Sequence, residues 1–120
     1  MAATYKNFRK KPVVIQASRW FKNGDHPEDH SVPMRDAETG ETFLTEGLVV
    51  RRFRHPDITG DKICITCRKT MHEHGWIDTL EGDHIVCPGD WIIRDVEGKF
   101  YTCNPSIFEA TYEYVAEESD

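Results

Sequence analysis

The chain has 120 residues, of which 38% are apolar and 30% charged, so it can close one domain around a small hydrophobic core. Its formal net charge is −6, and five acidic side chains without a basic one lie between residues 109 and 120: Glu109, Glu113, Glu117, Glu118 and Asp120. This balance disfavours nucleic-acid binding, which usually needs a basic stripe. Because no run approaches the roughly 20 apolar residues of a membrane span and no apolar signal segment follows the basic N-terminus, we expect neither membrane insertion nor secretion.

The first half of the chain predicts short strands and a long loop. Residues 12–20 predict a strand because β-branched and aromatic side chains dominate them. Residues 23–36 contain glycine and two prolines without apolar periodicity, which predicts a long loop. Residues 41–53 predict two short strands separated at Gly47.

The second half predicts hairpins. Residues 76–79 and 84–87 flank Gly82, which supplies the positive φ of a tight reversal. Residues 90–96 and 99–103 flank a second short turn. Together with residues 84–87, these segments are expected to form a three-stranded meander.

The C-terminal segment predicts one short helix near residues 105–110, because Asn104 is a good N-cap and Pro105 fits the first helical position. A final strand is expected over 111–115, and the acidic residues 116–120 should fray. The fold class is therefore mainly β (α+β): a small antiparallel sheet or open barrel in a single compact domain, residues 1–115. Its predicted core includes Ile92, Phe100, Ile107, Phe108 and Tyr112.

The densest group of reactive side chains lies at residues 64–74. Cys64 and Cys67 have the two-residue spacing with which two thiolates reach one ion from a tight turn. If residues 72–74 are extended, His72 and His74 leave the same face and can complete the site. The sequence thus predicts a structural zinc that stabilises this loop, with three residues that could replace either histidine: Cys87, His84 and His55.

Two other roles for this group are weaker. A redox pair would need a helix directly after the cysteines, and none is indicated. A catalytic zinc would need an open coordination position and a general base, and Glu73 invites comparison with zinc deaminases. The comparison fails because Cys64 and Cys67 precede the histidines here, whereas the deaminase cysteines follow.

Basic and aromatic residues give a further set of candidates. The basic run Arg51, Arg52 and Arg54 is typical of a solvated surface. Its alternative role is to hold the phosphate of a nucleotide whose base stacks on Trp76 or Trp91.

Several segments resemble known sequences: Pro88–Arg94, Gly98–Cys103 and Pro105–Glu113 in the C-terminal third, with Arg9–Ile15 and His74–Gly82. In these segments the chain is similar to a family of small uncharacterised proteins encoded by tailed bacteriophages and prophages, and His72–Cys87 resembles an actinobacterial-phage subset. The resemblance implies a phage origin, without an agreed activity. Because no export signal is indicated and the four cysteines are expected to be reduced, the expected location is the host bacterial cytoplasm.

The leading hypothesis is a phage accessory protein that binds a host protein or small ligand and carries a structural zinc. The alternatives are an anti-defence protein that sequesters a nucleotide signal, a small zinc-dependent enzyme and a virion component. An unpaired edge strand would also allow a homodimer.

Overall fold

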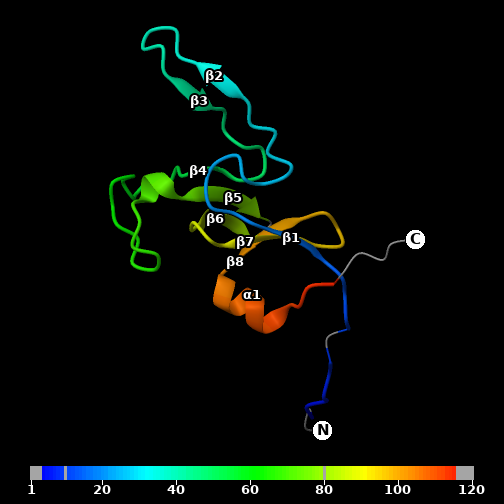
Figure 1. Ribbon diagram of the computed structural model, residues 1–120. Coiled ribbons are helices and arrows are strands. Elements are labelled where there is room, and N and C mark those ends of the chain that lie inside the picture. The colour runs from blue at the N-terminus through cyan, green and yellow to red at the C-terminus, as the bar shows by residue number, and fades with distance from the viewer. Residues whose placement is uncertain (1–3, 10, 80, 116–120) are drawn as a thin grey trace, which may run out of the picture.

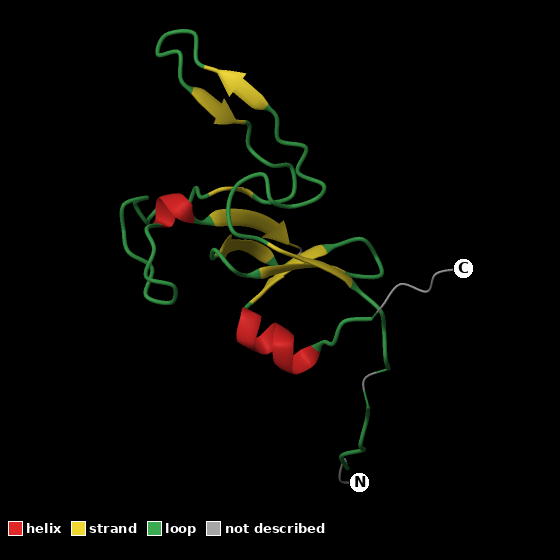
Figure 2. Ribbon diagram, viewed as in Figure 1, coloured by secondary structure: helices red, strands yellow, loops and turns green. Residues whose placement is uncertain are grey.

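The computed structural model describes residues 4–9, 11–79 and 81–115, and it shows small antiparallel sheets with a single short α-helix (Figures 1 and 2). The mainly β prediction is therefore confirmed. Within the described residues the sheets do not close into a barrel. The same residues contain no helix long and apolar enough to cross a membrane.

Within the described residues, eight strands form two three-stranded sheets and a separate hairpin. The first sheet has the order β1-β7-β8: β1 (Gln16–Arg19), β7 (Trp91–Arg94) and β8 (Phe100–Cys103). The second has the order β4-β5-β6: β4 (Arg51–Arg52), β5 (Gly75–Thr79) and β6 (Gly82–Val86). The hairpin pairs β2 (Pro33–Arg35) with β3 (Thr42–Leu44) and projects away from both sheets in Figure 1.

The two helical elements in the described part of the chain are short. A 3-10 helix, η1 (Met71–Glu73), precedes β5, and α1 (Pro105–Thr111) follows β8 at the predicted position. The Asn104 side chain caps α1 by accepting a hydrogen bond of 2.8 Å from the Ser106 N–H, as the sequence indicates.

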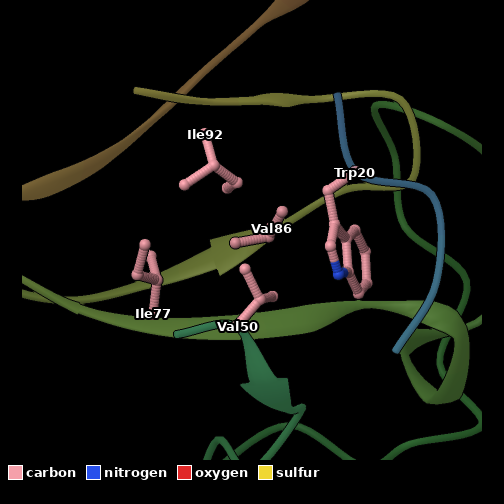
Figure 3. Close-up of a cluster of buried hydrophobic side chains, with 5 residues drawn as sticks. All are labelled: Trp20, Val50, Ile77, Val86 and Ile92. Carbon is pink, nitrogen blue, oxygen red and sulfur yellow. The ribbon is translucent and has the colours of Figure 1, made fainter. Parts of the chain in front are cut away.

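The core lies where the two sheets meet. Five buried side chains point toward one another in Figure 3: Trp20, Val50, Ile77, Val86 and Ile92. At Gly75 a Cβ would overlap the Val50 side chain and approach the Trp20 ring to 3.0 Å, so this tight packing requires a glycine.

The prediction that Ile107, Phe108 and Tyr112 pack in the same core as Ile92 and Phe100 was wrong. Ile92 is buried and Phe100 packs against the core cluster, but α1 covers the opposite face of β7. There Phe108 stacks on Trp91 with ring centroids 4.2 Å apart, and Tyr112 lies against Phe108. The Ile107 side chain is 61% exposed.

The strand pairing also differs from the predicted meander. Strands β6 and β7 belong to different sheets, because Pro88 and Gly89 lead the chain across to β1. The Gly89 N–H donates to the Trp20 carbonyl at 2.7 Å, and the Trp20 N–H donates to the Asp90 carbonyl at 2.8 Å. Strand β1 is shorter than predicted since it pairs only along the four residues of β7.

Two further expectations need correction, and a third lies outside the described residues. The predicted loop over 23–36 ends in strand β2, and no strand forms over 111–115, since Thr111 belongs to α1. The predicted fraying of 116–120 falls on residues that the structure does not describe.

Candidate metal centre

Four side chains converge at one end of the second sheet: Cys64, Cys67, His74 and Cys87. Their ligand atoms all lie within 4.8 Å of one another. They come from three segments, namely the turn at 64–68, the residue between η1 and β5, and the residue after β6. Three of the four predicted ligands are thus brought together, and Cys87 stands in the place predicted for His72.

A tight turn holds the two cysteines of the C-x2-C pair. The Arg68 N–H donates to the Cys64 carbonyl and the Cys64 N–H donates to the Lys69 carbonyl, both at 2.9 Å. Arg68 adopts a φ of 66°, the left-handed conformation that lets the chain reverse here. The turn therefore brings the thiols of Cys64 and Cys67 close together, although an extended chain would hold them apart.

Strand register brings the other two ligands together. Strands β5 and β6 pair Gly75 with Val86, so the next pair outward places His74 opposite Cys87. The His74 Nδ1 lies 2.8 Å from the Thr70 carbonyl oxygen. Because a carbonyl only accepts, Nδ1 carries the proton and Nε2 is left free to bind a cation or accept a hydrogen bond.

The distance between two of the thiols fits tetrahedral coordination. The Cys64 and Cys87 Sγ atoms are 3.9 Å apart. Two thiolates at about 2.3 Å from one zinc ion in a tetrahedron would lie about 3.8 Å apart, whereas a disulfide needs about 2.05 Å. The Cys67 thiol donates to the His74 Nε2 at 3.1 Å, a contact that an ion between the two atoms would replace.

The thiols of the group have unequal acidity. Burial raises the pKa of Cys64, but hydrogen bonds from the backbone N–H groups of Cys67 and Thr66, with contacts to the His74 and Cys67 side chains, outweigh it and lower this pKa to about 6. Burial raises the pKa of Cys87, and the charges of Asp90 and Cys64 raise it further. A divalent cation at the centre of the group would reverse this effect and deprotonate Cys87.

The structure places His72 outside the group. The Thr70 N–H donates to the Glu73 carboxylate at 3.2 Å, which helps to close η1 over residues 71–73. Residues 72–74 are therefore not extended as expected, and the two histidines do not leave one face. The His72 ring packs against Gly60, where a Cβ would overlap it.

The other substitutes also lie apart from the group. The His55 ring meets the edge of Trp76 with centroids 5.9 Å apart, and His84 is exposed on β6. Cys103 is the fourth cysteine and is not part of the group. Cys87 was recognised from the sequence only as a substitute, because the predicted hairpin of residues 76–79 and 84–87 places it opposite Trp76. The observed register is shifted by two residues and brings Cys87 opposite His74 instead.

The predicted ligand-binding residues do not form one group. Arg51 and Arg52 line a cleft beside the metal centre, while Arg54 forms an ion pair with Glu46. Trp76 is 7% exposed and Trp91 is covered on one face by Phe108, so neither indole lines that cleft.

The chain matches no protein-family model, no curated protein and no solved structure. The resemblance to phage proteins therefore stays a prediction, and functional inference rests on the Cys3His group and its surroundings.

Proposed function

We propose that this chain is a small binding domain whose fold is completed by one Zn²⁺ ion held by Cys64, Cys67, His74 and Cys87. The convergence of these four ligand atoms within 4.8 Å is the observation that carries the proposal. Three thiolates and one imidazole form a donor set that favours zinc over the hard cations, which prefer oxygen.

A structural role is favoured over a catalytic one. Four protein ligands satisfy tetrahedral zinc and leave no position for water or substrate, whereas catalytic sites have three protein ligands. Behind the ligands, Asp90 accepts a hydrogen bond of 2.9 Å from the Cys87 N–H, and Thr70 orients His74. Such outer contacts fix the ligands in place, as in other metal centres.

The ion would link parts of the chain that few other interactions join. The only β-pairing within residues 53–70 is one isolated bridge between Ile63 and Thr70, and none of these residues belongs to a strand. Ligands at Cys64 and Cys67 would tie this segment to the ends of β5 and β6. Because such a site does not exist in the unfolded chain, the free energy of metal binding contributes directly to folding.

A structural metal site is compatible with a domain that acts by binding, and this is the role that we propose. The resemblance implies a phage origin, and we propose further that the chain is an accessory protein that acts in the host cytoplasm on a host protein or small ligand. The projecting β2–β3 hairpin and the cleft beside the metal centre are the surfaces that support such a role.

The test is elemental analysis and thermal unfolding of protein purified without chelator. We expect about one zinc per chain, lost on His74→Ala or Cys87→Ser substitution and on chelation. A loss of even about 3 kcal/mol would lower the melting temperature by about 10 °C or more in a domain of this size.

His72→Ala is the matched control, because His72 neighbours the site in sequence and lies outside it in space. This variant should keep its zinc. Metal-free protein whose melting temperature is unchanged by zinc would contradict the proposal, and zinc loss in His72→Ala alone would contradict the ligand set.

A further inference from the structure

A cleft of about 350 Å³ opens beside the metal centre, and His74 belongs to both. Its walls come from the chain after β1, from β4 and from the segment around η1; the side chains that matter here are Phe21, Lys22, Arg51, Arg52, Phe53 and Lys69. The volume lies at the small end of the range for small-molecule sites, so the cleft suits a small ligand.

The charge in the cleft is opposite to that of the chain. Four of its lining residues are lysine or arginine and one, Glu73, is acidic, although the formal net charge of the protein is −6. One of the four, Arg51, is also paired with Asp78, which lies outside the cleft. The Glu73 carboxylate already accepts a hydrogen bond from the Thr70 N–H. A concave surface of one sign concentrates the field, so the cleft favours an anion.

The four cations divide into two kinds. The Arg52 guanidinium donates to the Leu44 carbonyl, and Arg51 lies 3.6 Å from Asp78, so both arginines are held in place. Lys22 and Lys69 are exposed, and in the described part of the chain neither forms an ion pair with a carboxylate. Positioned guanidinium groups with free ammonium groups beside them suit a phosphate.

The remaining walls are apolar. Phe21 is 50% exposed, with the Arg19 guanidinium 5.1 Å from its ring centroid. Phe53 is held edge-on against Trp76, with centroids 6.1 Å apart. Aromatic rings beside a cationic site favour an organic phosphate with a planar ring over inorganic phosphate, since the ring can stack while the phosphate is paired.

We propose that this cleft binds a small phosphorylated ligand that carries a planar ring, of the class of nucleoside monophosphates. The inference rests on the binding role proposed above and names the ligand class. Lys22, Arg51, Arg52 and Lys69 contact the phosphate, and Phe21 or Phe53 contacts the ring.

The test is a calorimetric titration of the protein as purified, at low salt, with AMP, ribose 5-phosphate, inorganic phosphate and adenosine. AMP should bind most tightly, and adenosine should show no measurable affinity. The double variant Lys22→Gln/Lys69→Gln should weaken AMP binding about tenfold, the effect of two partly exposed charge contacts. Lys11→Gln removes an exposed lysine outside the cleft and should leave the affinity unchanged.

Several results would overturn the inference: no binding of AMP, equal affinity for AMP and either adenosine or ribose 5-phosphate, or an unchanged affinity in the double variant. Binding of a single-stranded oligonucleotide without binding of AMP would also overturn it and point to a nucleic-acid interface.

Zinc content measured on the same samples separates the two proposals. Zinc-containing protein that does not bind AMP overturns only the ligand. Zinc-free protein that binds AMP supports the proposed ligand class and overturns the proposed zinc site. Equal zinc content in the wild type and the double variant shows that the charges, and not a disrupted metal centre, account for the lost affinity.

Discussion

The side chains of two buried polar residues, Asp29 and His26, hold the loop between β1 and β2 against the core. The Asp29 Oδ1 accepts hydrogen bonds from the Val49 and Val50 N–H groups at 2.8 and 3.0 Å. His26 lies edge-on to Phe100, and its Nδ1 accepts from the Glu28 N–H at 3.1 Å. The hydrogen bond from the Glu28 N–H needs the neutral form of His26, since a protonated Nδ1 cannot accept.

Stability should therefore depend on the protonation of His26. Burial lowers the pKa of His26, and the charges of Asp29 and Glu28 only partly offset it. A lowered pKa in the folded state means that the stabilising contribution is full above the unfolded value of about 6.5 and is lost as the pH falls toward the folded value. His26→Gln should reduce the fall in melting temperature between about pH 7 and pH 5.

The measurement is thermal unfolding of both proteins across that range, with zinc content followed in parallel because the metal ligands also take up protons in acid. An exposed-histidine variant, His84→Gln, is the control and should follow the wild-type curve. If His26→Gln also follows that curve, the neutral histidine does not stabilise the fold.

At the scale of elements, α1 is attached to the first sheet mainly through a single side chain, that of Phe108. Its residues are half-buried or exposed, and the stacked pair of Phe108 and Trp91, with rings only 7° from parallel, is its main contact with β7. A helix of two turns is not stable alone in water, so this contact decides whether it forms.

Phe108→Ala should consequently destabilise the protein by about 1–2 kcal/mol, less than a fully buried phenylalanine because Phe108 is only half-buried. Ile107→Ala, one residue away and exposed, should cost less than about 0.5 kcal/mol. Denaturant unfolding of the two variants measures the difference, and equal losses would show that the stacked pair does not anchor α1.

Local signals in the sequence predicted several elements whose partners are close in the chain, although they missed β2, which pairs with the nearby β3. The β5–β6 hairpin and α1 were confirmed because Gly82, Asn104 and Pro105 specify turns and caps through their own backbone chemistry. The pairing of β1 with β7 joins residues more than 70 positions apart, and no local pattern encodes it.

The same distinction applies to the metal centre. Cys64, Cys67 and His74 were recognised by their spacing, whereas the choice between His72 and Cys87 depended on η1 and on the β5–β6 register. The stretch Thr70–Glu73 has the Thr-x-x-Glu pattern of a capping box, which marks the start of η1. The sequence interpretation did not use this signal and took residues 72–74 as extended.

At the scale of the whole molecule, the fold combines a packed core between two sheets with segments that extend from it. The core cluster contains residues before β4 and on β5, β6 and β7, while residues 53–70 lie beside it and contain little regular structure (Figures 1 and 3). Local stability should vary accordingly, with the segment near the metal centre depending on the ion.

Hydrogen exchange should reveal this difference. Chelation should greatly accelerate exchange of the Cys64, Arg68 and Met71 amides, whose hydrogen bonds lie within the metal-linked segment, while the amides of the β1-β7-β8 sheet should change far less. Uniform acceleration across the chain would instead indicate a single cooperative unit in which removal of the ion unfolds everything.

The position of Cys87 also has a consequence for synthesis of the chain. Three ligands lie within eleven residues and leave the ribosome together, but the fourth follows only after the β5–β6 hairpin has been made. An ion captured early by Cys64, Cys67 and His74 would retain an open coordination position until β6 pairs with β5. Closure of the metal site would then report that the second sheet has reached its correct register, so a slipped hairpin would leave the ion exposed to competing thiols and chaperones of the cell.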